Sequence, residues 1–153
     1  MGAGFEVREA RPDETDAVLA LYGWLFEPPG MRPPRWDPER ARVALAAAIE
    51  TADAAVLVAE GGDGLVGLCT AYIDLESVRY GRRCWVEDLA VAPDRRSEGI
   101  GAALLGAARA WARGRGATHL ELDTGDARVD AQRFYERESP AWRSVGYAWT
   151  LEP

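Results

Sequence analysis

A strand followed at once by a glycine-marked helix start constrains this chain more than any other feature. Residues 84–91 (CWVEDLAV) have strand character, and apolar residues recur at helical spacing over residues 99–113. Gly99 and Gly101 stand where that helix begins. The first turn of a helix carries free backbone N–H groups and the positive end of its dipole, and glycines let a ligand approach them closely. The segment therefore predicts a site for a diphosphate.

Two common phosphate motifs do not fit this segment. A P-loop needs a lysine, and all 18 basic residues of the chain are arginine, which also excludes a lysine catalyst or Schiff base. The dinucleotide fingerprint needs a third glycine, and Leu104 stands in its place. Arg95 and Arg96 lie in the loop before the helix, so they add positive charge beside the expected anion. The segment indicates an anion site of another kind.

The patterning of the whole chain predicts one mixed α/β domain, residues 1–153, with a single central sheet flanked by helices. Asp13 and Asp37 are expected to cap the first two helices, and residues 74–82 to form a polar connection. The expected strands are residues 5–8, 54–60, 65–73, 84–91, 118–123 and 145–151, and the expected helices are residues 14–26, 38–50, 99–113 and one starting at Asp126.

Composition excludes several classes of function. With 25 acidic and 18 basic residues the formal net charge is −7, which disfavours nucleic-acid binding and favours a cationic or amine partner. No apolar run approaches the ~20 residues of a membrane span, and no leader is visible, so a cytoplasmic protein is expected. Cys69 and Cys84 are expected to be reduced thiols. The single histidine, His119, excludes a multi-histidine metal site and is interpreted as structural, and no metal is expected.

Three segments together resemble the GNAT superfamily of acetyl-CoA-dependent N-acetyltransferases. Residues 96–101 (RSEGIG) match that family's pyrophosphate loop, Arg/Gln-x-x-Gly-x-Gly/Ala, and residues 89–93 (LAVAP) resemble the strand before it. Ala131-x-x-Phe134-Tyr135 resembles the family's second conserved helix. The resemblance implies a GNAT-like sheet with a splayed strand pair at the acetyl-CoA cleft. It also implies that acetyl-CoA is the acetyl-donor cosubstrate and that the amine attacks it directly in a ternary complex.

The resemblance also assigns the cosubstrate-binding residues. The pantetheine arm is expected along the end of the strand, paired with main-chain groups, and the pyrophosphate on the amides of the loop and helix start. The expected cofactor-binding residues are Leu89, Ala90, Val91, Arg95, Arg96, Ser97, Glu98, Gly99, Ile100, Gly101 and Ala102.

Two residues are the candidate catalysts. Tyr135 aligns with the family's frequent general acid, and a phenol with an ordinary pKa near ~10 can share a proton with a leaving thiolate. Glu87 is the candidate base, because an ammonium must lose a proton before it attacks. Strict alternation puts Glu87 and Leu89 on one face of the strand and Asp88 on the other. A bulge would change that count, so Asp88 stays an alternative base. A main-chain N–H near Leu89 or Ala90 would stabilise the oxyanion.

The acceptor site is expected over the first two helices and the proline-rich loop between them. Trp36 with Glu27 there, and Asp88 on the strand, suit a cationic amine through cation–π and charge contacts; the alternative is that Trp36 only packs the loop. The leading hypothesis is acetylation of a small primary amine: a polyamine, an aminoglycoside or an amino-acid-like metabolite. Protein or peptide acetylation and a non-catalytic acetyl-CoA-binding module are the alternatives, and a homodimer stays open.

Two features depart from the family's pattern. The asparagine that often precedes the Phe-Tyr helix is missing, and Thr124 to Ala127 stand there instead. The Gly146-Tyr147 pair comes late, so residues 137–145 form an extra segment that could reshape the acceptor pocket.

Overall fold

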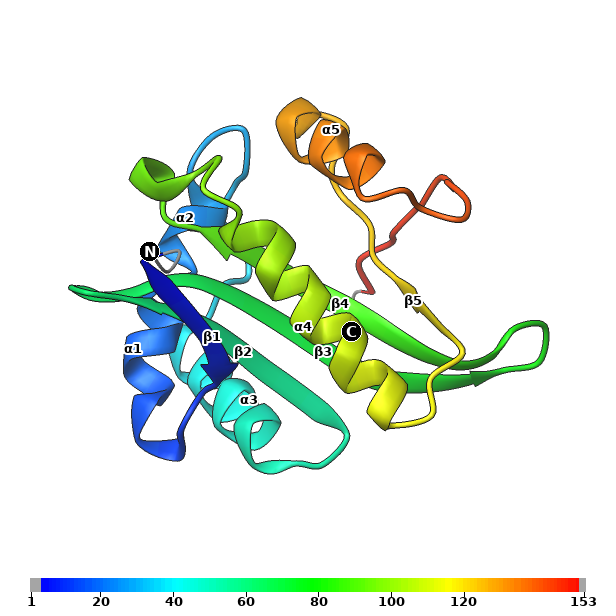
Figure 1. Ribbon diagram of the computed structural model, residues 1–153, viewed down its shortest axis with the longest axis horizontal. Coiled ribbons are helices and arrows are strands. Elements are labelled where there is room, and N and C mark those ends of the chain that lie inside the picture. Colours follow the sequence, from blue (N-terminus) through cyan, green and yellow to red (C-terminus); the bar gives the residue numbers. More distant parts are fainter. Residues whose placement is uncertain (1–3, 152–153) are drawn as a thin grey trace. The chain divides into compact units, whose positions relative to one another are not determined.

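Five strands form one mixed sheet in the order β1-β2-β3-β4-β5 (Figure 1). The computed structural model describes residues 4–151. The chain divides into two compact units, Met1–Leu122 and Asp123–Pro153, and the first holds the sheet. Strands β1 to β4 pair antiparallel with their neighbours, while β4 and β5 pair parallel, which confirms the predicted mixed α/β class. The strands are β1 (Phe5–Glu9), β2 (Ala54–Gly61), β3 (Gly64–Ser77), β4 (Gly81–Val91) and β5 (His119–Glu121).

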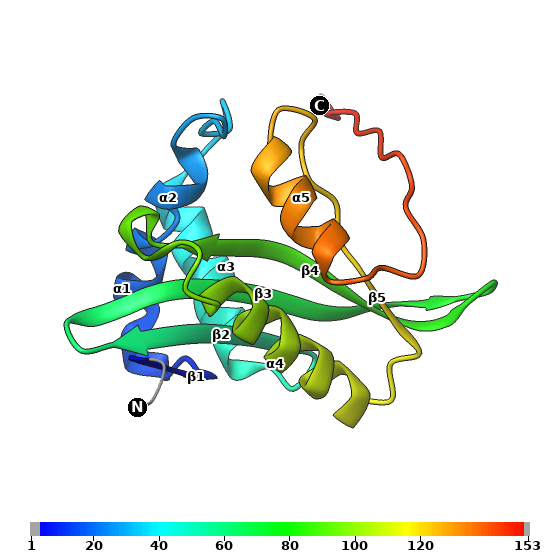
Figure 2. The same cartoon turned by 45° about the horizontal axis from the view of Figure 1, so that its top comes forward.

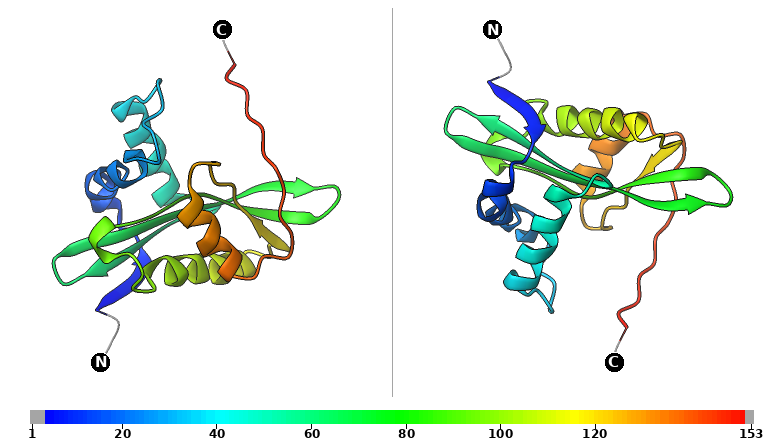
Figure 3. Two further views of the ribbon diagram at one scale, coloured as in Figure 1. Left: turned by 90° about the horizontal axis from the view of Figure 1, so that it is seen from above. Right: turned by 90° about the horizontal axis from the view of Figure 1, so that it is seen from below.

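Helices cover both faces of the sheet and create two apolar cores. Helix α4 (Ile100–Gly114) lies on one face, and α1 (Thr15–Ala20) and α3 (Pro38–Glu50) lie on the other (Figure 3). The continuous apolar run of β2 fits this position, because a central strand is buried on both faces. The fully buried side chains of the α4 core include Cys69, Cys84, Ile100 and Leu104, and those of the α1–α3 core include Val18, Val58 and Leu68.

The hairpin of β3 and β4 is longer than the sequence predicts. Residues 74–82 were expected to be a polar connection, but β3 continues to Ser77 and β4 starts at Gly81, so the two strands run past β2 (Figure 2). Cross-strand ion pairs stabilise the extension: Arg83 to Asp74 at 2.9 Å and Arg82 to Glu76 at 2.6 Å. The charged residues of this segment, which were predicted to form a loop, therefore pair across a two-stranded ribbon.

The predicted helix over residues 14–26 is broken into three pieces. A 3-10 turn (Pro12–Glu14) leads into α1, and a turn at residues 21–22 separates α1 from α2 (Gly23–Phe26). Glycine at the start of α2 has weak helix propensity, which favours a break there. Asp13 does not cap the helix, because it lies inside the 3-10 turn, whereas Asp37 caps α3 as predicted by accepting from two backbone N–H groups.

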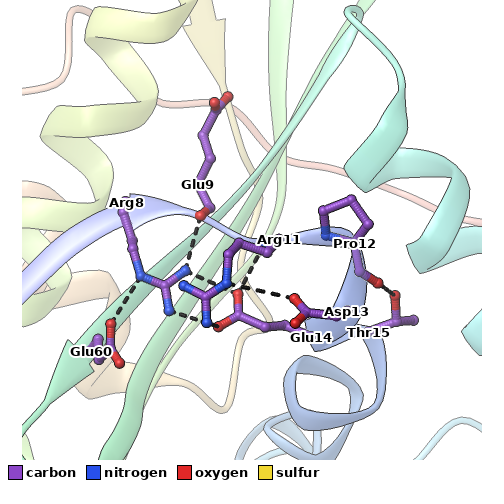
Figure 4. A network of polar contacts seen from close by, with 8 residues as sticks. All are labelled: Arg8, Glu9, Arg11, Pro12, Asp13, Glu14, Thr15 and Glu60. Atoms are coloured by element: carbon purple, nitrogen blue, oxygen red, sulfur yellow. Dashed lines mark hydrogen bonds and ion pairs between the residues drawn. The ribbon is translucent and has the colours of Figure 1, made fainter.

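An ion-pair network fixes the entry into α1 (Figure 4). Arg8 on β1 donates to both carboxylate oxygens of Glu14, at 2.7 and 2.9 Å, and to Glu60 on β2 at 2.9 Å. The Glu14 carboxylate also accepts from the Arg11 backbone N–H at 2.8 Å. A two-pronged arginine–carboxylate contact holds a fixed geometry. The network therefore sets where α1 starts against the sheet.

The second unit contains α5 (Val129–Arg137) and an extended tail. The helix starts later than predicted, and Asp126 is not its cap, since Arg128 holds that position. The predicted strand over residues 145–151 is wrong, because none of these residues has strand structure. Alternation suggested the strand, yet a strand also needs a partner's hydrogen bonds. Val145, Tyr147 and Trp149 are 78–80% exposed, so their apolar side chains pack little.

The described helices include none that is both long and apolar enough to cross a bilayer.

We expect the Glu14 network to make stability depend on pH. Hydrogen bonds from Arg8, the largest cause, and from the Arg11 backbone lower the pKa of Glu14 from 4.5 to about 2. A carboxyl whose pKa is lowered by folding stabilises the fold above its unfolded pKa and loses that effect as the pH falls through the folded pKa. Glu14→Gln should lower the free energy of unfolding by about 1 kcal/mol near neutral pH, because water screens the pair.

The difference in free energy of unfolding between the wild-type protein and Glu14→Gln should shrink between about pH 5 and about pH 2, as measured in urea melts of both proteins. Glu6→Gln, on the exposed side of the same strand, is the matched control and should change little. A deficit of constant size across that pH range would contradict the assignment.

Candidate active site

A one-residue bulge in β4 sets which side chains face which helices. Ala71 pairs with Val86 and Thr70 pairs with Asp88, so Glu87 is the extra residue. Val86 packs into the α4 core, and after the bulge Leu89 packs against that same core. The strict alternation that joined Glu87 with Leu89 is therefore wrong across this segment, and the bulge places Asp88 toward Tyr22, in the turn between α1 and α2.

Glu87 is exposed at the bulge. Its Oε2 accepts a hydrogen bond from Trp85 Nε1 at 2.6 Å. That contact orients the carboxylate from a residue of the same strand. An exposed, oriented carboxylate has the chemistry of a general base.

Asp88 is tied to both neighbouring elements. Its Oδ2 accepts from the Tyr22 hydroxyl and from the Thr70 hydroxyl, each at 2.7 Å. Thr70 Oγ1 in turn accepts the Asp88 backbone N–H at 3.1 Å. Burial, followed by the charge of Asp88, raises the pKa of Tyr22 far above its ordinary value, so its hydroxyl stays a donor. The carboxylate thus joins the turn between α1 and α2 to the bulge.

The proline-rich loop carries Trp36 onto this region. Its ring stacks on Tyr22 with centroids 6.2 Å apart, and meets Phe26 edge-on at 4.8 Å. Trp36 is half-buried, and Glu27 is exposed at the start of the loop. The sequence analysis did not single out Tyr22 or Thr70. The available signal was a tyrosine on the buried face of a helix, because a buried phenol needs a hydrogen-bond partner.

β4 and β5 separate beside this region. Their pairing ends at Trp85 with Glu121, whereas β4 continues to Val91. The Ala92 N–H donates to Val66 on β3, and main-chain groups alternate in direction along an antiparallel strand. Leu89 and Val91 therefore direct their N–H and C=O groups away from β3, toward the side where β5 has separated. This is the splayed strand pair that the resemblance implied.

The loop before α4 presents its backbone. Ser97 and Gly99 have left-handed φ values of 66° and 85°. Gly99 is the N-cap of α4 and supplies no side chain, and a Cβ built there meets no atom within 4 Å. No side chain caps the start of α4, so its first amides have the unmet donors with which helix starts bind anions. Arg96 is exposed, whereas Arg95 Nε contacts both Glu98 carboxylate oxygens, at 2.9 and 3.0 Å.

Tyr135 belongs to the second unit. It lies on α5, half-buried, with its ring centroid 5.2 Å from that of Phe134. Phe134 and Tyr135 are adjacent in the sequence, so their contact is local. The first unit holds every other candidate site residue.

The two cysteines and the single histidine pack within the fold. Cys69 and Cys84 are free and buried, as predicted, and burial raises their pKa to about 12 and about 11. His119 Nδ1 lies 3.0 Å from Thr118 Oγ1, and its ring packs on Tyr80. Within residues 4–151, no cluster of three or more ligating side chains could hold a metal ion.

Comparison with known proteins decides the family. The model of the acetyltransferase (GNAT) family matches residues 16–139. The chain belongs to this family. It is 31% identical to streptothricin acetyltransferase of Streptomyces lavendulae, over 89% of this chain and 81% of that protein. It is 38% identical to an aminoglycoside N(6′)-acetyltransferase of Klebsiella aerogenes, over 46% of this chain and 49% of that one.

A solved structure shows the same fold. The aminoglycoside N-acetyltransferase AAC(6′)-Iy in complex with CoA superposes with a TM-score of 0.80 at 16% identity, over 99% of this chain and 98% of that one. This likeness confirms the expected fold, and the family match with its acetyltransferase relatives confirms the expected GNAT membership and the acetyl-CoA-dependent N-acetyltransferase activity. The family implies acetyl-CoA as the cosubstrate.

We expect Gly99→Ala to destabilise this GNAT domain. A left-handed φ costs an L-residue about 1–2 kcal/mol even where space is free. The matched control is Gly106→Ala, in the exposed middle of α4, where a Cβ also meets no atom within 4 Å. Gly106→Ala should raise the free energy of unfolding by about 1 kcal/mol, because alanine has a higher helix propensity than glycine. Thermal and urea melts measure both, and equal effects of the two substitutions would contradict the strain at Gly99.

Proposed function

We propose that this protein acetylates a primary amine of a small molecule, by direct attack on acetyl-CoA in a ternary complex. The observation that carries the proposal is the meeting of two open main-chain surfaces: the edge of β4 at Leu89 and Val91, and the uncapped start of α4 at Gly99. A pantetheine arm needs strand-like amide partners, and a diphosphate needs helix-start N–H groups. The described residues fit both requirements.

The cosubstrate would contact a short stretch of chain. We assign its pantetheine arm to the strand end and its diphosphate to the loop and first turn of α4. Arg96 is exposed and would contact the diphosphate directly. Arg95 forms an ion pair with Glu98, which offsets the negative charge of that carboxylate beside the diphosphate. The assigned residues are Leu89, Ala90, Val91, Arg95, Arg96, Ser97, Glu98, Gly99, Ile100, Gly101 and Ala102.

We assign the proton transfers to Glu87 and Tyr135. When bound, acetyl-CoA supplies the activated thioester carbonyl. Glu87 takes the proton that the acceptor ammonium must lose, directly or through water; its exposure and its contact with Trp85 support this role. Tyr135 gives a proton to the departing thiolate, which the match of its helix to the family's motif supports. Asp88 is assigned to acceptor binding, because two hydroxyl groups already use its Oδ2.

A cationic amine is the substrate class that the observations favour. The net charge is −7, and Glu27, Trp36 and Asp88 together offer charge and an aromatic face. Relatives of the chain are named for streptothricin and for aminoglycosides, which supports a small-molecule acceptor over a peptide.

The first experiment is acetyl-CoA-dependent release of free thiol with separate pools of polyamines, aminoglycosides, amino acids and short peptides. We expect release above the no-amine rate with a pool of small amines. Release only with peptides would overturn the small-molecule assignment. Tight acetyl-CoA binding without release in any pool would overturn the enzymatic one in favour of a binding module.

Substitution of the two assigned catalysts tests their roles. Tyr135→Phe and Glu87→Gln should each lower kcat by about 100-fold, a common size for a lost general acid or base, and leave acetyl-CoA affinity unchanged by calorimetry. Tyr147→Phe, in the exposed tail of the same unit as Tyr135, is the matched control and should keep wild-type turnover. Unchanged turnover in Tyr135→Phe would remove the tyrosine from the mechanism.

A further inference from the structure

We propose that Tyr22 is a positioning residue that holds Asp88 ready to bind the acceptor ammonium. This inference rests on the proposed function and names the side chains that set its acceptor site. Tyr22 lies in the turn after α1, between the proline-rich loop and β4, and it contacts both. Its ring supports Trp36, and its hydroxyl donates to Asp88.

The contacts of Asp88 leave one of its oxygens for a ligand. Both hydroxyl donors, Tyr22 and Thr70, bind Oδ2 at 2.7 Å. Within residues 4–151, no group donates a hydrogen bond to the other carboxylate oxygen, Oδ1. Two hydroxyl donors on one oxygen fix the plane and direction of a carboxylate. An ammonium can then add a charge-assisted hydrogen bond to Oδ1 without an entropic cost for ordering the side chain.

The surroundings of Tyr22 suit this task and exclude a catalytic one. Its pKa is raised far above the ordinary value, first by burial and then by Asp88, so it neither ionises nor acts as a base near neutral pH. Tyr72 on the adjacent strand also has a raised pKa, from burial and then from Asp88. Neutral phenols therefore flank the carboxylate, and within residues 4–151 no arginine forms an ion pair with Asp88. Its negative charge stays available to a cation.

Tyr22 also links Asp88 to the proline-rich loop, residues 27–38, through Trp36. Trp36 stacks on the Tyr22 ring, and Phe26 braces Trp36 from the side. An amine held by Asp88 would therefore have an aromatic wall beside it that rests on the residue orienting the carboxylate. Specificity for cationic acceptors follows from this arrangement, because a neutral analogue gains nothing from Oδ1.

Tyr22→Phe tests the inference, since it keeps the ring on Trp36 and removes only the hydroxyl. With the best acceptor among spermidine, kanamycin and L-lysine, we expect KM for the amine to rise about tenfold. The kcat and the KM for acetyl-CoA should stay within about twofold, because the hydroxyl touches neither the thioester nor the cosubstrate residues. A fall in kcat at constant amine KM would overturn the inference.

Further variants separate positioning from mere structural support. Asp88→Asn should raise the amine KM at least as much, and the Tyr22→Phe, Asp88→Asn double variant should be no worse than Asp88→Asn alone. Thr70→Ser should keep the wild-type amine KM, whereas Thr70→Val should raise it. Tyr80→Phe, on the distant hairpin, is the control. Additive effects in the double variant would overturn the coupling.

A binding measurement keeps the outcome separate from that of the proposed function. If no amine is turned over, the proposed function fails, and spermidine is titrated by calorimetry into the CoA complexes of the wild-type protein and Tyr22→Phe. Weaker binding to the variant would support the inference as a binding device alone. Equal binding, or no binding to the wild-type protein, would overturn it.

Discussion

The bulge at Glu87 is the constraint on which the rest of this structure depends. One extra residue in β4 turns Leu89 into the α4 core and directs Asp88 toward Tyr22, in the turn after α1. Without it, the strand would bury a carboxylate under α4 or expose a leucine, and both are unfavourable. The helical layers on both faces can therefore contact this one strand: α4 packs on its apolar residues, and Tyr22, in the turn after α1, binds Asp88.

The bulge also explains why two adjacent carboxylates have different surroundings. Glu87 points outward with a single contact from Trp85, while Asp88 accepts two hydroxyl hydrogen bonds. Adjacent residues on a regular strand would face opposite sides of the sheet, whereas here Glu87 is the extra residue of the bulge and stays exposed beside Asp88. We propose that the exposed Glu87 carboxylate accepts the proton of an amine whose positive charge Asp88 binds.

The parts of the site that come from one continuous segment were predictable from sequence. Gly99 and Gly101 at the start of an apolar helix predicted the open amides, because helix starts have the same unmet N–H groups in any context. The strand pair 54–60 and 65–73 was predicted for a similar reason, since the turn between them is local. The tail over residues 145–151 shows the limit of this reasoning, because a strand pattern does not supply a partner.

The sequence by itself determined the family, the mixed α/β class, the glycine-marked start of α4 and the candidate carboxylates, since each depends on neighbours within a few residues or on one motif. Only the tertiary structure decided that Glu87 is exposed, with a contact from its own strand, and that Asp88 is held by groups distant in the sequence. Tyr22, Thr70 and Asp88 are separated by up to 66 positions in the chain and meet through sheet register and a bulge. Register follows from the packing of all strands together, so no local pattern specifies that meeting.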